Sequence, residues 1–62
     1  MRDISRIPKF LRTIQMYWEK CPDLRFGQII AGFFESLDRD PFYIEDDEME
    51  RLFIIHIDKM NK

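Results

Sequence analysis

The segment PDLRFGQIIAGFF, residues 22–34, constrains the fold most, because it is apolar around most of a helix. With its continuation to residue 37, its apolar positions cover more than half of a helix surface. They are Leu24, Phe26, Ile29, Ile30, Phe33, Phe34 and Leu37. A helix of this kind has to be central and covered by its neighbours. The 62-residue chain therefore has to build its core around residues 24–37.

Two glycines interrupt this segment, Gly27 and Gly32. Each costs about 0.5–1 kcal/mol relative to alanine in a helix interior, so we expect a compensating close approach of another backbone or of a bulky ring. Trp18 is one candidate for that contact and a partner chain is another. Leucine at either glycine is expected to disturb folding or assembly more than Arg12→Ala does.

The residues before the central segment predict a helix over 7–21. Its apolar stripe is spaced by three and four residues and comprises Ile4, Ile7, Leu11, Ile14, Trp18 and Cys21. Pro8 is tolerated in a first turn, so residues 1–6 form an N-terminal arm, or a separate turn capped by Asp3. Pro22 ends the helix, and Asp23 is expected to cap the next one.

The residues after the central segment predict a third helix over 46–60. The acidic run Glu45–Glu50 suits the start of a helix, and Met49, Leu52, Phe53, His56 and Met60 follow with helical spacing. Residues 42–44, FYI, are expected to be extended and to pack over the start of this helix. The prediction is an all-α, three-helix unit (7–21, 24–37, 46–60) in one domain, 1–62. Its short connections favour antiparallel neighbours.

Polar residues at the start of the central helix are assigned a structural role. Arg25 is expected to pair with Asp23 or with an acid of the 45–48 run, since arginine binds carboxylates with two donors. Gln28 is expected to satisfy a loop carbonyl. Binding of a partner is the alternative use of Arg25 and Gln28.

A chain of this length has few ways to reinforce a small core. The single cysteine, Cys21, excludes an internal disulfide, and one cysteine with one histidine, His56, does not make the usual structural zinc set. Oligomerisation and close helix packing are the remaining ways to stabilise so small a core. The chain is rich in aromatic residues and methionine, which are enriched at interfaces. We therefore expect a homo-oligomer with a protein partner, through an interface of Phe26, Ile30, Phe33, Phe34 and Trp18.

Charge is unevenly distributed along the chain. Residues 1–20 carry five basic and two acidic side chains, and residues 21–62 carry five basic and ten acidic ones, which gives the net charge of −2. The basic residues Arg2, Arg6, Lys9 and Arg12 offer an alternative function, the binding of nucleic acid through phosphate contacts. In the other interpretation, the basic residues of 1–20 face the acidic residues of 21–62, either in another chain or in the same fold.

The acidic residues invite two interpretations besides a solvated helix start. Asp38 and Asp40 begin like a calcium loop, but Phe42, Tyr43 and Met49 occupy positions that require a ligand or glycine. The acidic run Glu45–Glu50, with Glu35, Asp38 and Asp40, is alternatively a mimic of a nucleic-acid backbone. A solvated helix start is the simpler interpretation. We predict no metal site and no cofactor.

No constellation of catalytic residues is evident. Cys21 lies near a helix C-terminus, where the dipole does not favour a thiolate, and His56 has no acid and nucleophile beside it. We therefore predict a protein that is not an enzyme. No apolar run reaches the ~20 residues of a membrane span, and the start of the chain does not look like a signal peptide. A cytoplasmic location is expected.

Two motifs resemble a known family. Trp18 is followed by PDLRFGQII, residues 22–30, and then by DPFYIEDDEME, residues 40–50. This order resembles an uncharacterised family of short bacterial and phage-borne helical proteins with W…PDLR-x-GQ-I/L and D-x-FYIEDDE motifs. The resemblance implies a small, mostly helical, cytoplasmic protein, often carried by phages or other mobile elements, and no catalytic residue. We expect a protein-interaction or regulatory protein.

Overall fold

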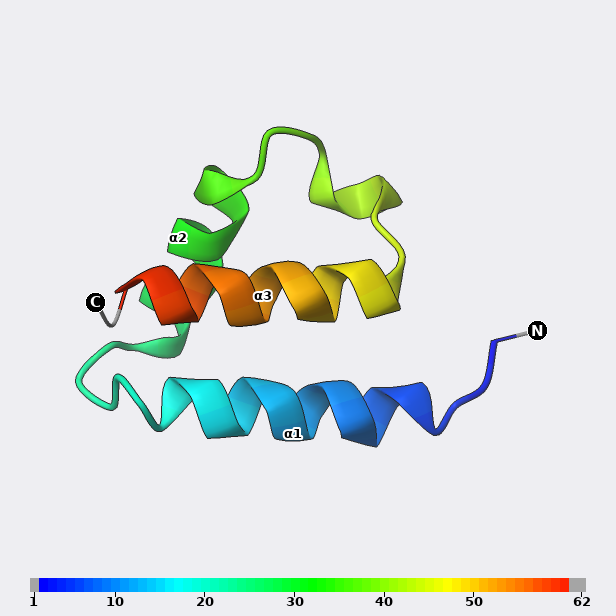
Figure 1. Ribbon diagram of the computed structural model, residues 1–62, viewed down its shortest axis with the longest axis horizontal. Helices are drawn as coiled ribbons and strands as arrows, with labels where there is room; N and C mark the ends of the chain where they lie inside the picture. Colours follow the sequence, from blue (N-terminus) through cyan, green and yellow to red (C-terminus); the bar gives the residue numbers. More distant parts are fainter. Residues whose placement is uncertain (1, 61–62) are drawn as a thin grey trace.

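Three helices and one short turn make up the structure, a computed structural model that describes residues 2–60. The helices are α1 (Arg6–Trp18), α2 (Phe26–Ser36) and α3 (Asp46–Met60), and a 3₁₀ turn, η1 (Pro41–Tyr43), precedes α3 (Figure 1). The predicted all-α, three-helix unit is confirmed. The bounds of α3 match the prediction, whereas α1 and α2 are shorter than expected.

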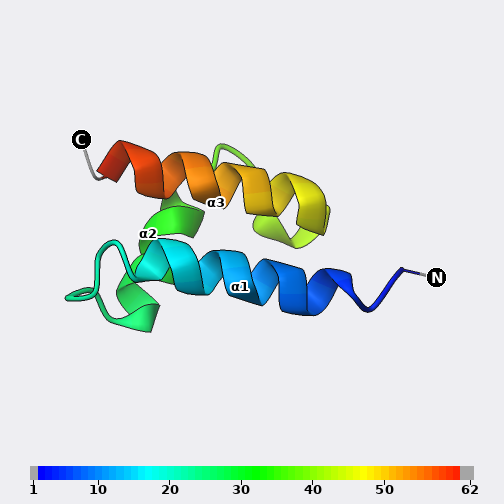
Figure 2. The ribbon, with the colours of Figure 1, turned by 60° about the horizontal axis from the view of Figure 1, so that its bottom comes forward.

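The helices do not form an antiparallel bundle. In both ribbon views α1 and α3 lie side by side and run in the same direction, while α2 crosses them steeply (Figures 1 and 2). The expectation of antiparallel neighbours was wrong, because residues 37–45 carry the chain back along α3 before that helix begins. Both helices therefore start at the same end of the molecule.

The core lies between α2 and α3. Ile29 and Phe33 of α2 pack against Phe53 and Ile57 of α3, and all four side chains are at most 2% exposed. The rings of Phe33 and Phe53 meet edge to face, with centroids 5.2 Å apart. Within residues 6–18, α1 has no fully buried side chain. It packs on this core through half-buried residues, among them Ile14, Tyr17 and Trp18.

The start of α1 is held by Asp3. The Asp3 carboxylate accepts a hydrogen bond from the Ser5 amide at 2.9 Å, and this bond lowers the pKa of Asp3. The predicted turn capped by Asp3 is therefore present just before the helix. At the other end, α1 stops at Trp18, and the Cys21 amide donates to the Trp18 carbonyl in a turn.

The start of α2 differs from the prediction. Arg25, and not Asp23, occupies the N-cap, where its backbone is extended and its amide donates to Gln28 Oε1 at 2.8 Å. Leu24 stays in the preceding turn because its carbonyl accepts a hydrogen bond from Trp18 Nε1 at 2.8 Å. A contact with the neighbouring helix thus fixes the conformation that places the cap at Arg25.

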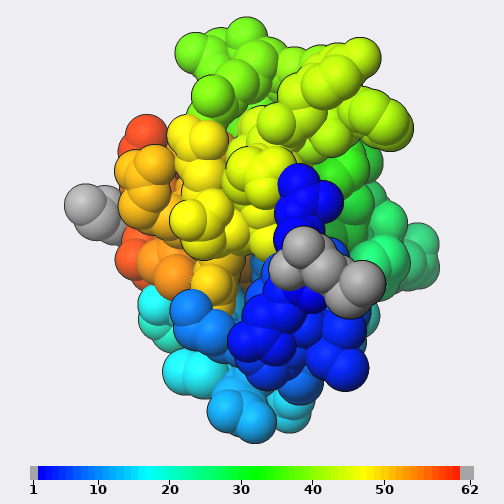
Figure 3. Space-filling model, turned by 90° about the vertical axis from the view of Figure 1, so that its right-hand side faces the viewer, coloured from blue at the N-terminus to red at the C-terminus, as the bar shows by residue number. Residues whose placement is uncertain are grey.

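The FYI segment also differs from the prediction. Residues 41–43 form η1, whose first turn is capped by Asp40 through the Phe42 amide, at 2.9 Å. Only Ile44 packs inward, while Phe42 and Tyr43 are 82% and 78% exposed. The expected packing of all three residues over α3 was wrong for these two aromatic side chains. Figure 3 shows this part of the chain, in yellow-green, projecting beside the start of α3.

The glycines of α2 have open space around them. Within residues 2–60, no heavy atom outside the helix backbone and the adjacent residues lies within 4 Å of a Cβ atom placed on Gly27 or Gly32. The expected close contact with Trp18 was therefore wrong. Trp18 packs on Phe26 instead, with ring centroids 5.7 Å apart. Contact of the glycines with a partner chain stays a prediction.

Candidate interaction surfaces

An apolar groove runs between α1 and the start of α2. Its volume is about 590 Å³, and it is lined by Leu11, Ile14, Gln15, Trp18, Glu19, Pro22 and Phe26. The rings of Trp18 and Phe26 lie side by side in its wall. Leu11 is 59% exposed and Phe26 54% exposed, so both sides of the groove present large apolar side chains to solvent.

The exposed apolar surface extends from the groove along α1. Ile4 and Ile7 are exposed, and a second hollow of about 220 Å³ between Ile7, Phe10 and Leu11 adjoins the groove. The cause lies in the sequence of α1, whose apolar side chains span a wider arc than α3 covers. Thr13 and Tyr17 turn toward α3 or the core, whereas Ile7 and Leu11, and Ile4 in the turn before α1, remain exposed.

The predicted interface residues do not all lie on one surface. Trp18 and Phe26 come together at the groove, and Ile30 is half-buried. Phe34 is 42% exposed but does not line the groove. Phe33 lies in the core, so the surface open to a partner excludes it. The contributions of Leu11 and Ile14 to an exposed groove were missed, although the three-and-four spacing of α1 had already placed them on one stripe.

A second exposed feature is the aromatic pair Phe42–Tyr43. The two rings meet edge to face with centroids 4.9 Å apart, and they project from η1. Aromatic residues, Phe and Tyr among them, are enriched at protein interfaces relative to the rest of the surface. Residues 42–44 were expected from the sequence to pack over α3, and so the exposure of Phe42 and Tyr43 was not predicted.

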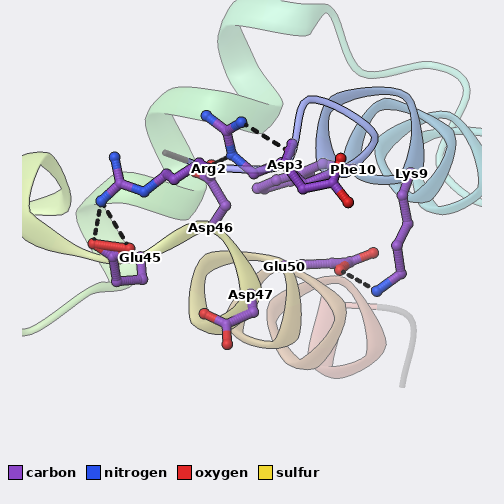
Figure 4. A pocket seen from close by; sticks show the side chains of 9 residues that line it. Arg2, Asp3, Lys9, Phe10, Glu45, Asp46, Asp47 and Glu50 are labelled. Atoms are coloured by element: carbon purple, nitrogen blue, oxygen red, sulfur yellow. Dashed lines mark hydrogen bonds and ion pairs between the residues drawn. The ribbon is translucent and has the colours of Figure 1, made fainter.

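Basic residues of the N-terminal part face acidic residues of α3 and its approach. Arg2 Nη2 lies 2.6 Å from Glu45 Oε1, Arg6 Nε lies 2.6 Å from Asp46 Oδ2, and Lys9 Nζ lies 3.4 Å from Glu50 Oε1 (Figure 4). Thr13 also donates to Glu50. These pairs form a row between the two parallel helices. The expectation that the basic part faces the acidic part of its own fold is confirmed.

The row of ion pairs argues against nucleic-acid binding by the basic residues. Arg2, Arg6 and Lys9 lie beside carboxylates, which cancel most of the positive charge that phosphate contacts require. Arg12 lies apart from the row. Within the part of the chain that the structure describes, it has no acidic partner. We therefore do not propose a nucleic-acid function.

The acidic run is largely engaged in the same way. Besides Glu45, Asp46 and Glu50, Glu48 pairs with Arg39 and with Arg51. In Figure 4 Asp47 points away from the basic side chains. Among residues 2–60, no three histidine, cysteine or acidic side chains are grouped so that they could hold a metal ion. The acids therefore act as ion-pair partners and first-turn residues of α3.

The polar residues of the α2 start have separate roles. Gln28 accepts a hydrogen bond from the Arg25 amide, which is a structural role. The partner of Gln28 is thus a backbone N–H group and not the expected loop carbonyl. Across residues 2–60, the Arg25 side chain has none of the ion pairs expected for it, and it is exposed. Asp23 is exposed in the turn.

Cys21 and His56 are both half-buried and lie in different settings. The Cys21 thiol lies 3.7 Å from the Tyr17 carbonyl, toward which it donates. The His56 ring packs on Phe33, with centroids 5.6 Å apart. Burial, and secondarily the positive charge of Lys59, lowers the pKa of His56. Both side chains thus have packing partners that account for their positions.

Comparison with known proteins adds no relative. Searches of family models, of curated proteins and of solved structures found no match to this chain. The resemblance to the family of short phage-borne proteins therefore stays a prediction. Among the helices of residues 2–60, none combines the length and the apolar character that crossing a bilayer requires.

Proposed function

We propose that this chain is a non-enzymatic protein–protein interaction or regulatory protein, which binds protein partners through its exposed apolar surface. The observation that carries the proposal is the groove on α1. A helix in a small domain ordinarily turns its apolar face to the core, yet α1 leaves Ile7 and Leu11 in solvent, and Ile4 in the turn before it is exposed as well. Contiguous apolar surface of this kind marks interaction sites on soluble proteins.

The aromatic pair Phe42–Tyr43 supports the same function at a second place. Neither ring contributes to the core, and each can be inserted into a pocket of a partner at little conformational cost. Predicted self-association belongs to this proposal, as do binding of a further protein and a cytoplasmic location. A phage or mobile-element origin rests on the sequence resemblance alone.

Site-specific photo-crosslinking in cells that produce the chain tests this function. A photoreactive amino acid replaces Leu11 in the groove, and in a control variant it replaces Glu35, which is exposed on α2 outside the groove. We expect discrete protein adducts from position 11 and none from position 35. If position 11 yields no adduct, or if both positions yield the same diffuse labelling, the interaction function is wrong.

A further inference from the structure

We propose that the groove on α1 is the interface of a symmetric dimer, in which a second copy of the chain packs its own α1 antiparallel against it. This inference rests on the proposed function and identifies the partner at one surface. It begins with two exposed charged residues, Arg12 on α1 and Glu19 at the C-cap of that helix. Both are exposed, and both lie away from the row of ion pairs with α3.

Arg12 and Glu19 have no oppositely charged partner among residues 2–60. Across residues 2–60, Arg12 has no acidic partner, and the Glu19 carboxylate accepts only from Gln15 Nε2, at 3.1 Å. In contrast, Arg6 and Lys9, on the α3 side of the same helix, each have a carboxylate partner. The exposed side of α1 and its C-cap thus presents one charge of each sign that has no ion-pair partner in the described part of the chain.

The spacing of these two charges is self-complementary. Arg12 and Glu19 are seven residues apart, so they lie on the same edge of the helix, about 10.5 Å apart along its axis. A two-fold axis between Gln15 and Met16 keeps the same edges of the two helices together and reverses their direction. It therefore places each Arg12 opposite Glu19 of the second copy.

The apolar groove is centred at the same place. Its lining residues extend from Leu11 on α1 to Glu19 at the C-cap of α1, on both sides of Gln15. The two-fold axis that matches the charges therefore also brings Leu11 of one copy against Trp18 of the other. The exposed Ile7 extends toward the end at which the second copy presents Phe26. Charge pairing and apolar burial thus select one arrangement.

Light scattering across a dilution series, from about 1 µM to about 1 mM, tests the dimer. We expect the wild-type chain to shift from monomer to dimer within this range. Arg12→Glu places like charges opposite Glu19 twice in the dimer, and we expect it to raise the dimer Kd about tenfold or more. The double variant Arg12→Glu/Glu19→Arg restores opposite charges, and its Kd should return to within about threefold of wild type.

Arg51→Glu provides the matched control, because it makes the same charge change on the exposed surface of α3. Its Kd should stay within about threefold of wild type. A wild-type monomer at every concentration overturns the dimer, as does a dimer whose Kd does not respond to Arg12→Glu or is not restored in the double variant. If the chain is a monomer and position 11 still crosslinks to a different protein, the dimer is wrong and the interaction function stands.

Discussion

Arg6 Nε donates a hydrogen bond to Asp46 Oδ2 at 2.6 Å and thereby joins the first residue of α1 to the first residue of α3. The contact lies where two helix N-termini come together, and each terminus carries partial positive charge. The Asp46 carboxylate is favourable to both termini. The charge of Arg6 is unfavourable to its own helix, and Asp46 offsets it. The ion-pair row thus supports the parallel arrangement of α1 and α3.

Removal of the Asp46 charge is expected to reduce stability modestly. Asp46→Asn should lower the free energy of unfolding by about 0.5–1 kcal/mol at low salt, because both side chains are partly solvated and the pair is screened. Urea unfolding at low and high salt measures this effect, which should shrink as salt rises. Asp47→Asn is the control, because Asp47 shares the first turn but points away from the basic residues. Equal losses in both variants would reduce the role of Asp46 to a helix-dipole effect.

Adjacent phenylalanines of α2 should respond very differently to truncation. Phe33 is 2% exposed and contacts Phe53, so Phe33→Ala is expected to cost about 3–5 kcal/mol and to unfold most of the protein. Phe34 is 42% exposed, and Phe34→Ala should cost about 1 kcal/mol or less. Circular dichroism during urea unfolding measures both. Similar losses for the two variants would contradict the placement of Phe33 in the core.

Alanine at Gly27 is expected to stabilise the protein. A Cβ atom at this position meets no neighbour within 4 Å, so Gly27→Ala gains helix propensity without a clash; since Gly27 lies in the first turn of α2, the gain in the free energy of unfolding is at most about 0.5–1 kcal/mol. Ala31→Gly, at an exposed interior position of the same helix, makes the reverse change and should lose about 0.5–1 kcal/mol. Both values follow from urea midpoints. A destabilised Gly27→Ala variant would show that another backbone occupies the space, as a partner chain would.

Protonation of His56 is expected to weaken the fold. Burial against Phe33 lowers its pKa below the ordinary value of 6.5, so the unfolded chain binds the proton more readily than the folded one. The contribution of neutral His56 to the free energy of unfolding is therefore complete above pH 6.5, the ordinary pKa. It is lost as the pH falls through the lower pKa that His56 has in the folded protein.

Comparison with His56→Gln isolates this effect. The difference in unfolding free energy between wild type and variant, measured at about pH 7.5 and about pH 5.5, should move against the wild type at the lower pH. Carboxylates titrate in both proteins, so their contribution largely cancels in the difference. A difference that does not change with pH would mean that His56 has the same pKa in the folded and unfolded chains.

Local patterns in the sequence were sufficient for the number of helices and for the bounds of α3. The acidic first turn and the helical spacing from Met49 to Met60 are local to one segment, so they can be recognised in the sequence without knowledge of the fold. Other features depended on contacts between segments. The start of α2 moved to Arg25 because Trp18 binds the Leu24 carbonyl, a hydrogen bond that no local pattern indicates.

The candidate site divides in the same way. The sequence by itself determined the apolar stripe of α1, the excess of aromatic residues and the division of charge between the two parts of the chain, because these are properties of residue types and their spacing. Only the tertiary structure decided that α3 runs parallel to α1 and covers one side of that stripe. Packing of α2 on α3 placed Phe33 inside, and the arrangement left Leu11 and Phe26 facing solvent. It also brought Arg6 to Asp46, whereas Arg12 has no ion-pair partner among residues 2–60. The physical reason is that a small core has room for only part of the apolar surface, and the packing direction selects which part is buried.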